Sequence, residues 1–154
     1  MPLLYNQIPI SGQAGSVILT IDGNVREWAT IKNIAATITL IDDPYKVMGG
    51  NGATRHKFAG WEGAGDVTYH YMDSTITKII LGYIKSGKYP DITVVITNDD
   101  PASAAGRQSI SLMHVMFPTV EIAKLDVETN LLEGSSSFTF SDVSGLELFS
   151  DLQL

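Results

Sequence analysis

Residues 42–73 read DDPYKVMGGNGATRHKFAGWEGAGDVTYHYMD, and the pattern of the chain changes within this stretch. It holds 6 of the 14 glycines, and residues 42–65 sustain neither the helical nor the strand repeat of apolar residues. From Asp66 onward, apolar and polar residues alternate, which predicts a strand with two different faces. We therefore expect a long structureless loop, followed by a strand over residues 66–72.

The composition of this loop argues against plain disorder. It contains apolar side chains that favour burial, namely Tyr45, Val47, Met48, Phe58 and Trp61. A structureless segment of this length inside a compact domain is either disordered or functional. If the parent domain cannot bury these side chains, another subunit can, which is a first indication of an assembly protein.

The length and composition of the whole chain fit one globular domain over residues 1–154. A chain of 154 residues buries about two thirds of its surface on folding. No apolar run approaches the ~18 residues of a membrane span, and the first residues, MPLLYNQIPISG, do not resemble a signal peptide. The absence of cysteine excludes disulfide scaffolds, thiolate zinc sites, thiol nucleophiles and iron–sulfur clusters.

The net charge of −7 is unevenly distributed. Residues 1–90 carry 8 basic and 7 acidic groups, whereas residues 91–154 carry 2 basic and 10 acidic groups. A basic, apolar loop and an acidic second half could be complementary surfaces on successive copies of one molecule. The alternative is a solvated acidic face that serves solubility. A duplex-binding groove is disfavoured in either case, because affinity for phosphates requires clustered Lys and Arg.

Two strands are expected before the loop. Residues 16–21 alternate and lead into Asp22-Gly23-Asn24, which is typical of a tight hairpin turn. A long return strand over residues 25–41 has one apolar face and one small, mostly polar face of Asn, Ala and Thr. Such a polar face suits a wet, uncharged surface, although many antiparallel sheets have an ordinary solvated side.

The rest of the chain predicts one helix and several short strands. The helix is capped by Asp73-Ser74 and ends at Ser86-Gly87. Strands are expected over four ranges, the third with a change of phase near Ala123 that suggests a bulge or a passage between sheets: 91–98, 109–116, 119–128 and 137–141. We predict a mainly β fold, a two-sheet β-sandwich or barrel with one flanking α-helix and a long extended loop.

No catalytic or metal-binding constellation stands out. His56, His70 and His114 lack the spacing of a metal site. The paired carboxylates Asp42-Asp43 and Asp99-Asp100 precede prolines, as in turns. The glycine cluster leads into a strand and is not followed by the Gly-Lys-Ser/Thr of a phosphate loop. We therefore expect no enzyme activity, no metal and no cofactor.

The order of these features resembles the tail-tube proteins of contractile-tailed bacteriophages and of phage-tail-like bacteriocins. The resemblance covers residues 11–145 and rests on order and spacing, because no piece is a chemical signature. The matching pieces are Ser11-Gly12 with Gly15, Asp22-Gly23, Met48-Gly49, Gly63-x-Gly65 before the aromatic strand, the helix after Ser74, Ala123-x-Leu125-Asp126-Val127 and Phe138-Thr139-Phe140.

The resemblance implies a subunit of six-membered rings that stack into a hollow tube for DNA passage. It implies that residues 42–62 form an inter-subunit arm, with contacts from Tyr45, Lys46, Val47, Met48, Arg55, His56, Lys57, Phe58 and Trp61. It implies lumen-facing positions at Thr37, Thr39, Thr68 and His70. The expected partners are further copies of the chain, a tail sheath protein, and tape-measure and baseplate or terminator proteins. The expected location is the virion tail, assembled in the bacterial cytoplasm without membrane contact.

Two alternatives remain open at this point. The chain could form the inner tube of an R-type bacteriocin or another contractile injection system, to which the same protein physics applies. In a different class, it could be a monomeric β-sandwich module that binds sugar or peptide through Tyr45 and Trp61.

Overall fold

The computed structural model describes residues 10–28, 30–70, 74–101 and 106–149. Within these ranges, no helix is both long and apolar enough to cross a membrane. The elements are β1 (Gly15–Ile21), β2 (Asn24–Glu27), β3 (Ile31–Lys46), β4 (Thr54–His70), α1 (Thr75–Ser86), β5 (Ile92–Asp99), β6 (Arg107–Met113), β7 (Met116–Val120), β8 (Glu133–Phe140) and β9 (Asp142–Glu147).

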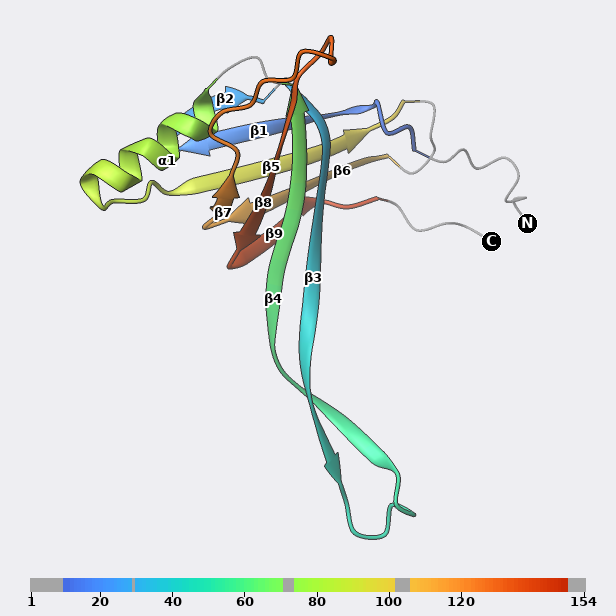
Figure 1. Cartoon of the computed structure of the whole chain (residues 1–154). Coiled ribbons are helices and arrows are strands. Elements are labelled where there is room, and N and C mark those ends of the chain that lie inside the picture. The colour runs from blue at the N-terminus through green and yellow to red at the C-terminus, as the bar shows by residue number, and fades with distance from the viewer. Residues whose placement is uncertain (1–9, 29, 71–73, 102–105, 150–154) are drawn as a thin grey trace.

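The strands form two antiparallel sheets, which confirms the predicted mainly β, two-sheet fold with one helix. The first sheet has the order β2-β1-β5-β6-β9, and the second has the order β3-β4-β8-β7. The β1–β2 hairpin turns at Asp22 and Gly23, both with positive φ, as its sequence predicts. Figure 1 shows both sheets in one body, from which only β3 and β4 project.

Among the described strands, the chain passes between the sheets at four places. The first lies between β2 and β3, the second runs through α1 between β4 and β5, the third lies at His114 and the fourth at Ser141. The single return strand predicted over residues 25–41 is wrong, because the chain leaves the first sheet at Trp28, whose side chain is buried in the core. The passage predicted near Ala123 is also wrong, because β7 ends at Val120 and residues 121–132 form no strand.

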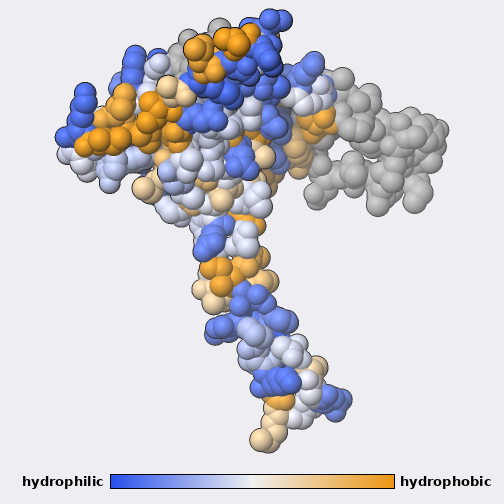
Figure 2. Space-filling model, viewed as in Figure 1, coloured by the Kyte–Doolittle hydropathy of each residue, from blue (hydrophilic) through white to orange (hydrophobic). Residues whose placement is uncertain are grey.

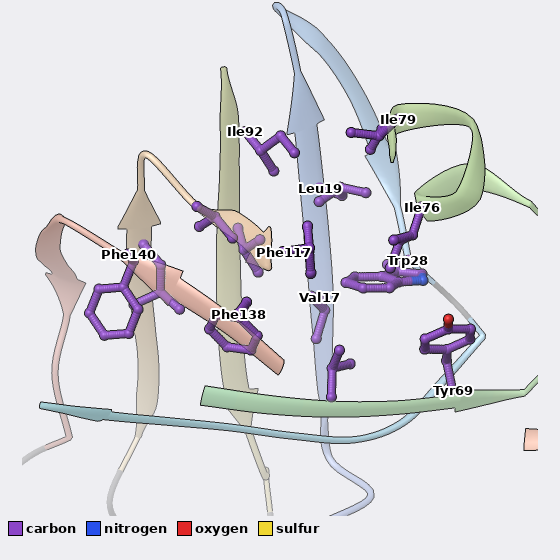
Figure 3. Packing of buried hydrophobic residues seen from close by; sticks show 14 residues of the cluster. Val17, Leu19, Trp28, Tyr69, Ile76, Ile79, Ile92, Phe117, Phe138 and Phe140 are labelled. Atoms are coloured by element: carbon purple, nitrogen blue, oxygen red, sulfur yellow. The ribbon is translucent and has the colours of Figure 1, made fainter. Parts of the chain in front are cut away.

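The core lies between the inner faces of the two sheets (Figure 3). Leu19 and Val94 of the first sheet and Phe138 of the second are almost completely buried. Trp28 joins the layers, with its ring centroid 6.0 Å from that of Tyr69 and 6.3 Å from that of Phe117. Burial of each large apolar side chain contributes about 1.5–3 kcal/mol to folding, so this cluster is the main source of stability.

Helix α1 covers part of this core with one stripe of its surface. Ile76 and Ile79 are buried, whereas Tyr83 and Ile84, which follow at helical spacing, stay exposed. The helix ends as predicted at Gly87, which has φ 73° and donates its N–H to the Tyr83 carbonyl oxygen at 2.7 Å. Ser74 occupies the N-cap position without a side-chain capping bond, and the predicted Asp73 lies outside the described residues.

Glycines of the second sheet lie directly beneath aromatic rings of the neighbouring strand. Gly65 is paired with Phe138 and Gly63 with Phe140 in the β4–β8 register. A Cβ at either glycine would collide with the ring of its partner. The same arrangement recurs with Tyr69 and Gly134. These three pairs let β4 and β8 approach closely while the aromatic rings cover the exposed backbone.

We predict that Gly65→Ala lowers the free energy of unfolding by roughly 1–3 kcal/mol, because the new methyl group overpacks the core. It would collide with the Ala35 carbonyl oxygen as well as with the Phe138 ring. The matched control is Gly82→Ala on α1, where a Cβ meets nothing within 4 Å. The control should raise stability by about 0.5–1 kcal/mol. Urea unfolding of the unassembled chain, followed by circular dichroism, measures both; equal stability of Gly65→Ala and the parent chain contradicts the prediction.

Candidate assembly interface

The most prominent surface feature is the long hairpin of β3 and β4. The two strands stay paired from Ile31–Tyr69 to Lys46–Thr54. The neighbouring strand β8 supports β4 only between Gly63 and His70, so the hairpin beyond this point has two strands and no third. Figure 1 shows it projecting away from the body. The structureless loop predicted for residues 42–65 is therefore wrong, because most of it is strand.

Three glycines of the cluster, Gly49, Gly50 and Gly52, lie at the tip of this hairpin, whereas Gly60, Gly63 and Gly65 lie within β4. Residues 47–53 make two successive turns, closed by the Gly50 N–H to the Val47 carbonyl oxygen at 3.2 Å and the Ala53 N–H to the Gly50 carbonyl oxygen at 3.0 Å. Gly49 and Gly52 have φ of 84° and 75°, which side chains other than those of glycine, asparagine and aspartate rarely adopt. Between the tip and the body, the pairing of β3 with β4 shifts register at Ile41 and Asp42, where a bulge bends the ribbon.

The arm, residues 42–62, exposes large apolar side chains to solvent. Met48 is fully exposed and Phe58 is 67% exposed. An isolated two-stranded hairpin is at best marginally stable in water, and clustered exposed apolar groups mark interaction surfaces. Figure 2 shows the arm as a narrow stalk that carries hydrophobic residues between hydrophilic ones. The exposed large apolar residues on and next to the arm are Ile38, Leu40, Ile41, Tyr45, Val47, Met48, Phe58 and Trp61.

The outer part of the arm is basic. Between residues 45 and 58 the chain has three basic residues and no acidic one. Lys46, Arg55 and Lys57 are exposed, and none of them forms an ion pair within the described part of the chain. Between Arg55 and Lys57 on the same strand, His56 Nδ1 lies 2.5 Å from Asp42 Oδ2. The structure thus brings all nine predicted arm residues into one projecting, apolar and basic element.

The four predicted lumen positions lie on one face of the second sheet. Thr37 and Thr39 of β3 share this face with Thr68 and His70 of β4, opposite the buried side of the sheet. Strand β8 extends the same face, because Thr68 is paired with Ser135. Further small polar residues on this face are Asn33, Ser137 and Thr139. Small polar side chains therefore cover much of this face across the three strands.

Sequence reasoning missed the acidic residues of this outer face. Glu62 and Asp66 lie on it, because they pair with Thr39 and Ala35. Alternation from Asp66 already placed that carboxylate beside Thr68, but Glu62 lay in the part interpreted as a loop. At the edge, Lys32 Nζ donates to Glu133 Oε1 at 2.7 Å, and this hydrogen bond lowers the pKa of Glu133.

The residues of the predicted sugar or peptide site do not come together. Tyr45 is paired with Arg55 and Trp61 with Leu40, and this register places the two aromatic rings on opposite faces of the hairpin. The Trp61 ring instead lies 6.2 Å from the Phe140 ring at the base of the arm. No group of three potential metal-binding residues is found among the described residues.

We predict that Phe58→Ser changes the free energy of unfolding of the unassembled chain by less than about 0.5 kcal/mol, since the side chain contacts solvent and not the core. The comparison variant is Phe138→Ala, whose ring is 2% exposed and which should lose roughly 3–5 kcal/mol. Urea denaturation of both variants provides the measurement. A large loss of stability in Phe58→Ser means that the arm folds back onto its own body.

Comparison with known sequences identifies the family. Residues 5–147 match the sequence model of the family described as "Phage tail tube protein". The chain is 34% identical over 148 residues to the phage-like element PBSX protein XkdM of Bacillus subtilis (strain 168), covering 96% of this chain and 97% of that protein.

Solved structures with the same fold, at low sequence identity, include chains from an anti-feeding prophage and from a contractile injection system. One is a chain from the anti-feeding prophage baseplate, 6-fold symmetrised, with a TM-score of 0.68, 15% identity and coverage of 90% of this chain and 96% of that one. Another is a chain from the sheath/tube terminator of an extracellular contractile injection system, with a TM-score of 0.69, 10% identity and coverage of 92% and 99%. The chain belongs to the phage tail tube protein family, whose members are structural proteins of the virion tail and not enzymes.

Proposed function

We propose that this protein is the subunit of a tail tube in which hexameric rings stack around a hollow lumen, inside a contractile sheath. The observation that carries the proposal is the arm, an apolar and basic hairpin that the described residues of its own chain leave uncovered. A subunit with such an element is complete only in an assembly. In the assembly, the arm of residues 42–62 reaches a copy in the adjacent ring.

The edges of the second sheet support the proposal of a closed ring. Its order leaves β3 and β7 as edge strands with unpaired backbone groups. Joining the edges of neighbouring subunits in a closed ring removes this hazard and makes one continuous barrel. The six-fold symmetry of the anti-feeding prophage baseplate, whose chain has the same fold, supports six as the number of subunits.

The outer face of the second sheet lines the lumen in this proposal. Thr37, Thr39, Thr68 and His70 present small polar groups there, and Glu62 adds a carboxylate. DNA carries a dense row of phosphate charges, which bind Lys and Arg clusters and are repelled by carboxylates. A wall without free basic groups lets DNA slide without sticking.

A contractile injection system without a genome is the second candidate. The solved structures above support it, because one comes from the sheath and tube terminator of such a system. In both candidates the subunit meets a sheath protein outside, a tape-measure protein inside, and baseplate and terminator proteins at the ends. Purified particles decide between them: DNA-filled heads attached to the tubes indicate a phage, and tubes without heads or DNA indicate an injection system.

We predict that replacing residues 45–58 with Asn-Gly leaves a folded monomer that no longer polymerises. The body keeps its core, since Trp61 and β8 remain, whereas the contact between rings is lost. Circular dichroism checks the fold, and negative-stain electron microscopy with sedimentation checks assembly against the parent chain. Rods of normal length from the shortened chain contradict the role of the arm.

We predict that a single cysteine at Thr39 becomes inaccessible to bulky reagents when tubes form. The chain has no native cysteine, so labelling reports this one site. Before assembly, a small maleimide and a polymer-linked maleimide should both react. In tubes the small reagent should still react while the polymer-linked one is excluded from the interior. Equal labelling by both reagents in intact tubes places Thr39 outside the lumen.

A further inference from the structure

The segment between β7 and β8 exposes a second set of apolar residues. We call residues 121–132 the acceptor loop. Leu125 is 87% exposed and Val127 is 93% exposed, and Ile122 and Leu131 are also more than half exposed. Such a concentration of exposed apolar groups on a short loop marks an interaction surface.

The acceptor loop is acidic, whereas the arm is basic. Residues 121–132 contain Glu121, Asp126 and Glu128 against a single Lys124. Glu128 forms no ion pair within the described residues, and Glu121 makes only a long contact of 3.9 Å with Lys124. The loop therefore matches the arm in apolar content and has the opposite charge.

Hydrogen bonds within the loop hold it in shape. Asp126 Oδ1 accepts the Glu128 N–H at 3.0 Å, and Asp126 Oδ2 accepts the Thr129 hydroxyl at 2.8 Å. Lys124 Nζ donates to the Glu133 carbonyl oxygen at 3.0 Å and ties the loop to the start of β8. A loop with this internal bonding loses less freedom on binding than an unordered one.

The loop and the arm tip lie at opposite ends of the molecule. Strand β8 begins at Glu133 beside His70, at the far end of β4 from Thr54 and the arm tip. Sixteen residues of strand separate Thr54 from His70. At ~3.3 Å a residue this is about 50 Å along the strand. Figure 1 shows the loop at the top of the molecule and the arm tip at the bottom, and Figure 2 shows hydrophobic residues gathered at that upper end beside hydrophilic ones.

We propose that the acceptor loop of one copy receives the arm of a copy in the next ring. Apolar residues of the arm, such as Val47 and Met48, cover Leu125 and Val127, while the basic residues of the arm face Glu121 and Glu128. A contact between two different surfaces at opposite ends of one chain repeats without closing, which gives a filament. This inference rests on the proposed tube function and names the surface that the arm binds.

Charge reversal tests the pairing directly. At the concentration at which the parent chain assembles, the arm variant Arg55→Glu/Lys57→Glu should form no tubes. The loop variant Glu121→Lys/Glu128→Lys should form none either. Each should show a critical concentration for assembly raised by roughly tenfold or more, because like charges then face each other. A chain with all four substitutions restores opposite charges and should assemble at close to the parental concentration. The matched control for the arm variant is Lys85→Glu/Lys88→Glu at the end of α1. It lowers the net charge by the same amount as the arm variant and is expected to assemble.

A second variant removes the apolar half of the contact. Leu125→Ser/Val127→Ser should keep the parental urea midpoint, since both side chains are exposed, and should lose assembly. Normal tubes from both loop variants, together with failure of the arm variant, overturn the acceptor loop while the tube function stands. Normal tubes that fail only to bind sheath protein overturn it as well and make the loop a sheath contact. An unmodified chain that forms no tubes instead removes the proposed function itself.

Discussion

The seating of Phe138 and Phe140 on Gly65 and Gly63 is the contact on which the second sheet depends. Through it β8 holds β4, and β4 in turn is the only described strand that holds β3. Ring contacts run without interruption from Trp28 through Phe117, Phe138 and Phe140 to Trp61 at the base of the hairpin. The core is thereby continuous with the root of the arm, so the arm begins from a fixed direction even though none of the residues that the structure describes supports its tip.

Sequence reasoning succeeded where a segment buries one face against its own chain. The Asp22-Gly23 hairpin, α1 with its Gly87 cap and the strand that carries Phe138 and Phe140 are examples. It failed over the arm, residues 42–62, because both faces of most of this ribbon contact solvent and no burial imposes an alternating pattern. The family resemblance, combined with the parity of the alternating strands, selected the four outer-face residues. The break at Trp28 depends on tertiary packing in the core, which a repeat of apolar residues does not record.

The exposed apolar surface must remain soluble until subunits meet. A net charge of −7 keeps copies apart at long range. Strand β3 is an edge strand, and its outer part carries Pro44, which lacks a backbone donor, between carboxylates and Lys46. Proline and charged residues on an edge discourage indiscriminate strand pairing. The proline and the charged residues interrupt the apolar pattern that would predict a strand from the sequence. The same residues protect the arm from aggregation.

The placement of arm and acceptor loop at opposite ends of one polypeptide gives any stack of such subunits a direction. One terminus of the stack displays only hairpin tips and the other displays only acidic loops, whatever the number of layers. Initiation and capping are therefore different recognition problems, and no single capping protein with one binding face can serve both. Growth at either end of the stack also keeps its direction, since each added layer presents the same surface that the next layer needs.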